Sequence, residues 1–151
     1  MKKILLLGAL LCLPFSALAD GYAKVFKTQG TFQDVRDSLQ LAIEGKGLVI
    51  NHTNQIAGML ERTGKDLGAT RQVYVKGEQF EFCSASISRR MMEADVQAIT
   101  MCPYILSVYT VPDDPNVYLA YRKPPETGNP ALNKALAEVA ALLDEIIEEA
   151  M

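Results

Sequence analysis

The sequence predicts one small domain in which α-helices and β-strands are mixed along the chain. Three observations predict this fold class: a strand–helix–strand pattern over residues 23–52, a hairpin pattern over residues 104–122, and a long amphipathic pattern that begins at Pro130. A chain of 151 residues is long enough to build one domain with a hydrophobic core. The sequence contains no internal repeat and no second domain boundary.

The opening strand–helix–strand unit carries the clearest local signals. Residues 23–28 are predicted as a strand, and the spacing of Thr31 and Asp34 resembles a capping box at the start of a helix. The apolar residues that follow recur on one helical face: Phe32, Val35, Leu39, Ala42 and Ile43. Gly45 and Gly47 are predicted to end this helix, because glycine adopts the left-handed C-cap conformation without steric cost. Residues 48–52 are predicted as the second strand.

The middle of the chain alternates between helical and extended patterns. Residues 55–68 are predicted as a helix, residues 78–83 as a strand, and residues 84–99 as one continuous helix. Residues 104–111 and 117–122 are strongly β-forming and are separated by turn residues, so they are predicted to pair as a hairpin. The chain therefore has about five predicted strands.

A long helix is predicted to close the chain from Pro130, which suits the first helical position because its missing N–H has no partner there anyway. Its apolar residues form one stripe: Leu132, Leu136, Val139, Leu143, Ile146 and Ala150. The stripe predicts that this helix covers the sheet; the alternative is a helix–helix seam in a homodimer. Acidic residues crowd the last turns and oppose the helix dipole, which predicts fraying at this end.

Residues 1–19 have the three parts of a secretory signal peptide. Lys2 and Lys3 precede a short apolar run, and Ala17-Leu18-Ala19 predicts cleavage after Ala19. The apolar run is shorter than the roughly 20 residues that a membrane helix needs, so no membrane attachment is expected after cleavage. We therefore expect a periplasmic protein. Removal of 19 of the 151 residues leaves 132, and loss of the two lysines changes the formal net charge from −3 to −5. The charges are scattered, which argues against a nucleic-acid partner.

Several motifs resemble the family called domain of unknown function 302. They cover nearly the whole chain after the signal peptide: Phe32-Gln33-Asp34-Val35, Gly47-Leu48-Val49-Ile50-Asn51-His52, the segment from Met59 to Gly68, Phe82-Cys83-Ser84-Ala85, Met91-Met92-Glu93-Ala94-Asp95, Cys102-Pro103-Tyr104 and Val108-Tyr109. The resemblance implies a compact α+β domain with a mostly antiparallel sheet backed by helices. It implies no activity, because the family is named for having none assigned.

Cys83 and Cys102 are the two cysteines that remain after cleavage of the signal peptide. In an oxidising compartment two cysteines suggest a disulfide. If a straight helix connects parallel strands, however, the two residues lie at opposite sheet ends, on the order of 15 Å apart. A disulfide requires Cα atoms within about 7 Å, which antiparallel strands would allow. A disulfide, buried free thiols, and a ligand-binding or redox role are the three alternatives.

Soft donor atoms suggest a metal site. His52 is the only histidine, and together with Cys102 and Met101 it offers imidazole, thiolate and thioether donors, which suit copper(I) or haem iron. A haem would be noncovalent, because no Cys-x-x-Cys-His motif is present. Arg62 and Asp66 lie in a polar stretch and could contact a ligand, or could pair with each other along a helix.

These residues favour a small exported binding or accessory module rather than a catalyst. We expect a small ligand or soft metal near His52, Cys83 and Cys102, with Arg62 and Asp66 as further candidates. The alternatives are a thiol-dependent oxidoreductase accessory and a structural interaction domain that forms a homodimer through its sheet edge or last helix. All of these site hypotheses require the imidazole and the two thiols to converge.

Overall fold

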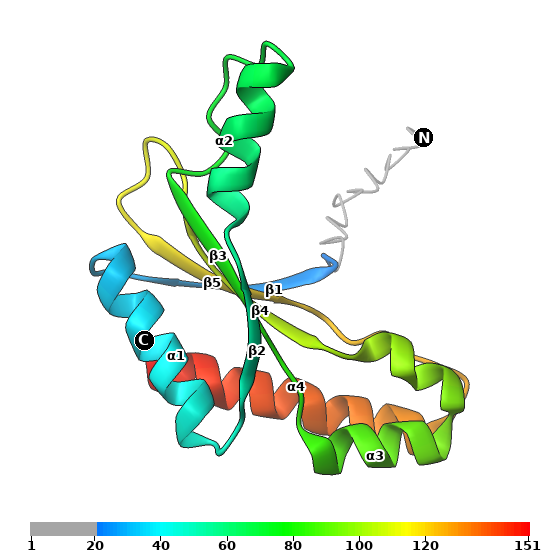
Figure 1. Ribbon diagram of the computed structural model, residues 1–151. Coiled ribbons are helices and arrows are strands. Elements are labelled where there is room, and N and C mark those ends of the chain that lie inside the picture. Colours follow the sequence, from blue (N-terminus) through cyan, green and yellow to red (C-terminus); the bar gives the residue numbers. More distant parts are fainter. Residues whose placement is uncertain (1–20) are drawn as a thin grey trace, which may run out of the picture.

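Residues 21–151 are described by a computed structural model, and the predicted signal peptide with its cleavage site lies outside these residues. Five strands and four α-helices alternate along the described chain (Figure 1). Their bounds are β1 (Ala23–Thr28), α1 (Phe32–Gly45), β2 (Ile50–Asn54), α2 (Ile56–Asp66), β3 (Lys76–Phe82), α3 (Ala85–Ala94), the 3₁₀ helix η1 (Val96–Met101), β4 (Tyr104–Thr110), β5 (Val117–Arg122) and α4 (Pro130–Ala150).

The five strands form one antiparallel sheet in the order β1-β5-β4-β3-β2. The hairpin of β4 and β5 forms the middle of the sheet, and the first strand of the chain pairs with the last one. The predicted α+β class, with an antiparallel sheet of about five strands and a long C-terminal helix, is confirmed. β2 begins two residues later than predicted and carries a register shift between Ile50 and His52.

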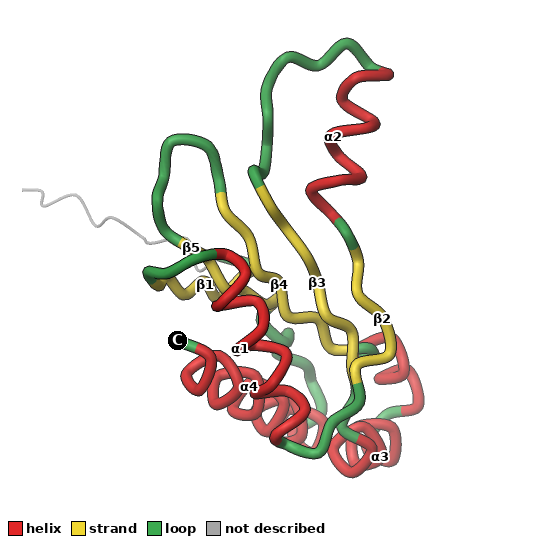
Figure 2. The backbone as a smooth tube through the Cα atoms, turned by 60° about the vertical axis from the view of Figure 1, so that its left-hand side comes forward, coloured by secondary structure: helices red, strands yellow, loops and turns green. Residues whose placement is uncertain are grey.

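One face of the sheet is covered by α1, α3 and α4 (Figure 2). The apolar stripe of α4 is buried there, so it packs inside the chain as predicted and is not available as a dimer seam. α4 is helical to Ala150, where Ile146 and Ile147 are fully buried and Lys46 forms ion pairs with Glu145 and Glu149, and these contacts oppose the predicted fraying. None of the helices in residues 21–151 has the length and apolar character needed to cross a bilayer.

The predicted helix over residues 84–99 is in fact two helices. Asp95 has an extended backbone conformation (φ −155°, ψ 119°), which ends α3 at Ala94. Its carboxylate accepts a hydrogen bond from the backbone N–H of Gln97 at 2.9 Å and caps η1. The cap and the change of direction bring Met101 back towards the start of β4. The helical periodicity was correct on either side of Asp95, but the sequence reasoning missed this capping residue.

The helix α2 extends away from the rest of the domain in both views (Figures 1 and 2). It begins beside β3, where Ala57 lies close to Gly77, and it contributes no buried residue. The opposite face of the sheet carries no other helix of the described chain. The side chains on this face alternate with the core residues. In β4, Ile105, Ser107 and Tyr109 are half-buried and alternate with the buried residues Tyr104, Leu106 and Val108.

Candidate functional site

The two cysteines lie at the same end of the sheet. Cys83 follows the last residue of β3 and Cys102 lies two residues before β4, and these strands are antiparallel, with Phe82 opposite Tyr104. The segment formed by α3 and η1 therefore leaves the sheet and returns to the same end. This is the antiparallel arrangement that allows the two residues to meet, and both are free thiols in the structure.

Cys83, Cys102, Ser88, Tyr104 and Met91 form a connected group that we call the dithiol cluster. The Ser88 hydroxyl lies 3.2 Å from Cys102 Sγ and 3.1 Å from the Tyr104 hydroxyl. The Tyr104 hydroxyl donates to Met91 Sδ at 3.6 Å. Ser88, Met91 and Tyr104 are buried between α3 and the sheet, whereas both cysteines are half-buried. The cluster thus joins two partly accessible thiols to a buried chain of polar and sulfur groups.

The electrostatics of the cluster favour neutral thiols. Burial raises the pKa of the Cys83 thiol, and the charge and hydrogen bond of Cys102 raise this pKa further. A hydrogen bond with the backbone of Tyr104 lowers the same pKa by less. Burial also raises the pKa of Tyr104. No cation contributes to either shift, so nothing here stabilises a thiolate in the way that reactive cysteines require.

The remaining candidate residues are dispersed. His52 lies on the exposed strand β2, opposite Glu81, and makes no side-chain hydrogen bond or ion pair within residues 21–151. Arg62 and Asp66 are exposed on α2, where the only charged pair of that helix joins Lys65 and Glu61. The described residues contain no group of three histidine, cysteine, aspartate or glutamate side chains placed to hold a metal. The structure therefore brings the two thiols together without the imidazole.

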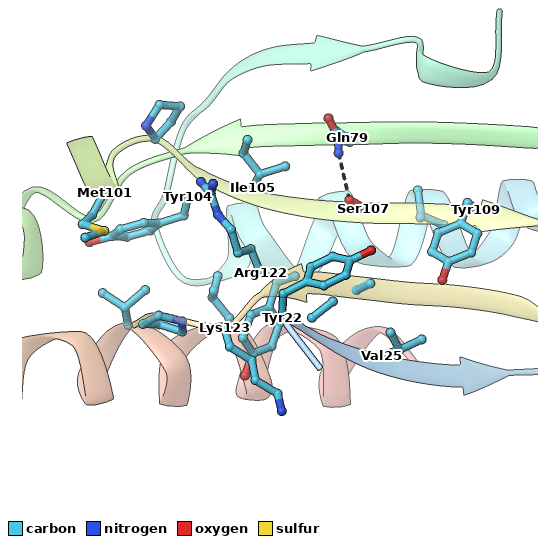
Figure 3. Close-up of a pocket in the computed structure, with 18 of the residues that line it drawn as sticks. Tyr22, Val25, Gln79, Met101, Tyr104, Ile105, Ser107, Tyr109, Arg122 and Lys123 are labelled. Atoms are coloured by element: carbon cyan, nitrogen blue, oxygen red, sulfur yellow. Dashed lines mark hydrogen bonds between the residues drawn. The ribbon is translucent and has the colours of Figure 1, made fainter. Parts of the chain in front are cut away.

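Met101 lies between the dithiol cluster and a second feature, a pocket of about 880 Å³ on the uncovered face of the sheet (Figure 3). We call it the sheet-face pocket. It is lined by residues from β1, β3, β4, β5 and the segment after β5, together with a few residues of α2, α3, η1 and α4. Gln79 donates a hydrogen bond to Ser107 at 3.1 Å on its floor. Neither cysteine is among its lining residues.

The sequence reasoning missed this pocket. One signal could have indicated it: polar and aromatic residues alternate with apolar ones in the middle strands. An alternating strand has one face against the core and one face open. In β4 the open face carries Ser107 and Tyr109, which alternate with Leu106 and Val108 on the core face.

Comparison with known proteins agrees with this fold. The model of the family described as "Domain of unknown function DUF302" matches residues 24–150. The chain belongs to the DUF302 family. A solved structure titled "Crystal structure of uncharacterized conserved protein DUF302 from Bacillus stearothermophilus" is similar, with a TM-score of 0.72 and 13% sequence identity over 86% of this chain and 98% of that one. At this identity the likeness shows that the DUF302 fold is shared. None of the curated proteins is significantly similar to the chain.

Proposed function

We propose that this DUF302 chain is an exported binding module that holds one copper(I) ion between Cys83 and Cys102. The observation that carries the proposal is the adjacency of the two thiols: they lie just outside the paired residues Phe82 and Tyr104, and the interaction with Cys102 raises the pKa of Cys83. Thiolates are soft ligands that select copper(I) over the harder divalent ions. Two thiolates are sufficient donors for this ion, so neither an imidazole nor a carboxylate needs to be near.

The surroundings of the thiols support a binding role over a nucleophilic one. The raised pKa of Cys83 keeps its proton on at neutral pH, and the ionised form is the one that attacks disulfides. A metal ion displaces such a proton directly, because binding releases protons from its cysteine ligands. The buried side of the cluster, with Ser88 bound to Cys102, holds the thiol in place without supplying charge.

Copper(I) also suits the cluster better than haem does. The sheet-face pocket is the large cavity near these sulfur atoms, but neither cysteine lines it. A thiolate ligand to haem iron would have to project into the space that the macrocycle occupies. The dithiol cluster requires an ion rather than a flat ring.

The export of the protein remains part of this proposal. Export is supported by the signal-peptide pattern of residues 1–19: two lysines, a short apolar run and the cleavage motif Ala17-Leu18-Ala19. A periplasmic location would expose the two thiols to oxidation, so the purified protein is reduced before the metal is added.

The test is a competition between the reduced protein and bicinchoninate for copper(I) under anaerobic conditions. We expect wild type to remove one copper ion per chain from the coloured chelator complex, and we expect Cys83→Ser and Cys102→Ser each to weaken binding by about tenfold or more. Affinity falls as pH is lowered, because protons compete for both sulfur atoms. His52→Ala is the matched control and should bind as wild type does. Copper retained by the double variant Cys83→Ser/Cys102→Ser, or no copper taken by wild type, would refute the proposal.

A second function rests on the same adjacency: reversible formation of a Cys83–Cys102 disulfide. The two thiols would transfer two electrons to an external disulfide, which is reduced to two thiols that take up the two protons. Intact mass measures this state directly, since the oxidised chain is lighter by two hydrogens. If the exported protein is fully oxidised and resists reduction, a structural disulfide replaces the copper site as the role of these residues.

A further inference from the structure

The sheet-face pocket offers a second site that does not depend on the cysteines. Its volume of about 880 Å³ lies within the range of about 300–1,000 Å³ that small-molecule sites occupy. Its floor is the open face of the sheet, with Ile105 and Ser107 of β4 and Val25 of β1 (Figure 3). Apolar side chains thus alternate with a few polar groups, as in sites that bind organic molecules.

Arg122 supplies a charge to this pocket. It is the last residue of β5, is exposed, and its side chain makes no hydrogen bond or ion pair with any other residue of the described chain. Figure 3 shows its guanidinium group directed between Tyr104 and Ile105, across the floor of the pocket. Lys123 follows it in the pocket wall.

Arg122 also has no acidic counterpart in the pocket. Glu78 is the one carboxylate among the lining residues, and the Nε of Arg36 binds it at 3.0 Å. The lining residues of the described chain therefore offer no free carboxylate to pair with Arg122, although the chain as a whole is acidic. A guanidinium presents parallel N–H donors that match both oxygens of a carboxylate, so an anionic ligand is complementary to the Arg122 end of the pocket.

Aromatic rings form the other end of the pocket. Tyr109 stacks on Tyr118 with ring centroids 5.2 Å apart and planes inclined by 13°. Tyr74 meets the same Tyr109 edge-on at 5.3 Å. Tyr22 lies between these rings and Arg122 (Figure 3), and it is 86% exposed, which leaves its ring free to pack on a bound molecule. An aromatic ring that packs on another aromatic ring is stabilised by more free energy than the burial of its apolar area accounts for.

We propose that the sheet-face pocket binds a small aromatic carboxylate, with its carboxylate on Arg122 and its ring against Tyr22, which lies between Arg122 and Tyr109 (Figure 3). Gln79 and Ser107 lie between the two ends of the pocket and can bind a polar substituent of the ring. Met91 and Tyr104 of the dithiol cluster line this ligand site, but neither cysteine does, so substitution of the cysteines separates ligand binding from copper binding.

The test measures the binding of matched probes to the protein by isothermal titration calorimetry. The probes are 2-naphthoate, its neutral analogue 2-naphthalenemethanol, and cyclohexanecarboxylate, which keeps the charge but lacks the aromatic ring. We expect 2-naphthoate to bind about tenfold more tightly than either analogue, a difference typical of one charge-assisted hydrogen-bonding pair. Equal affinity for the acid and the alcohol overturns the role of Arg122.

Variants separate the pocket from nonspecific binding. Arg122→Gln should weaken 2-naphthoate by about tenfold and leave 2-naphthalenemethanol unchanged, whereas Arg62→Gln removes an exposed guanidinium on α2 and should change neither. Cys83→Ser/Cys102→Ser should bind 2-naphthoate as wild type does, so failure of the copper proposal leaves this one intact. Absence of binding, or a dimer in sedimentation that occludes the pocket, overturns the proposal.

Discussion

Replacing Ser88 with alanine tests whether the dithiol cluster is held together by its hydrogen bonds. Ser88 is 8% exposed, and its hydroxyl is shared between Cys102 Sγ at 3.2 Å and the Tyr104 hydroxyl at 3.1 Å. Each neutral hydrogen bond contributes about 0.5–1.5 kcal/mol net. The higher helix propensity of alanine offsets about 0.5 kcal/mol of the loss. At the middle of that range the two bonds contribute about 2 kcal/mol, so the net cost of Ser88→Ala in free energy of unfolding is about 1–2 kcal/mol.

The assay is urea unfolding of the reduced protein, followed by far-UV circular dichroism. With an m-value of about 2 kcal/mol/M, the expected cost lowers the urea midpoint by about 0.5–1 M and leaves the slope unchanged. Ser86→Ala is the matched control, since Ser86 lies on the same helix but is exposed, and its change should be much smaller.

A double-mutant cycle with Tyr104→Phe isolates the bond between the two hydroxyl groups. The two changes share that bond, so together they should cost about 1 kcal/mol less than the sum of the separate costs. If Ser88→Ala destabilises the protein no more than Ser86→Ala, or if the two changes are additive, the hydrogen-bonded cluster described above does not exist in solution.

Three further predictions concern other parts of the fold. Burial raises the pKa of Cys83 above its ordinary value of 9.0. The neutral thiol therefore stabilises the reduced protein below that pH, and this stabilisation is lost as pH rises through the raised pKa. In urea unfolding, Cys83→Ser should lose less stability than wild type as the pH is raised above about 9. Tyr121 donates a 2.7 Å hydrogen bond to Asp144, and both burial and this carboxylate raise the pKa of Tyr121. Asp144→Asn should therefore shift the tyrosine ionisation measured at 295 nm to lower pH, and an unchanged titration contradicts the contact. Asp95→Ala removes the cap on Gln97 and should cost about 0.5–2 kcal/mol in thermal or urea unfolding, whereas Asp95→Asn, which keeps a cap acceptor, should cost less.

Local periodicity was sufficient to predict most elements of this fold. The strands Ala23–Thr28 and Val117–Arg122 lie where they were predicted, and α4 begins at Pro130. These segments combine a regular apolar pattern with an unambiguous cap or turn. The break at Asp95 was not predicted, because aspartate inside an apolar pattern is compatible both with a helix and with a new cap.

The candidate site depended on information that lies outside any local segment. Whether Cys83 and Cys102 meet depends on the direction of β4 relative to β3, and the connecting helices do not encode that direction locally. The position of His52 depends on the edge strand β2, whose register shift next to Ile50 has no clear sequence signal. The pocket depends on which sheet face the helices leave open, and this emerges only when all five strands are assembled.

The separate position of α2 gives the architecture a modular character. β2 and β3 are antiparallel neighbours, with Asn54 opposite Gln79, so a short turn could join them directly. Instead, α2 and the segment that follows it are inserted between β2 and β3, and α2 adds no residue to the hydrophobic core. Such an insertion can vary in length and sequence while the sheet and its three packed helices keep their geometry, which makes it the natural place for one relative to differ from another.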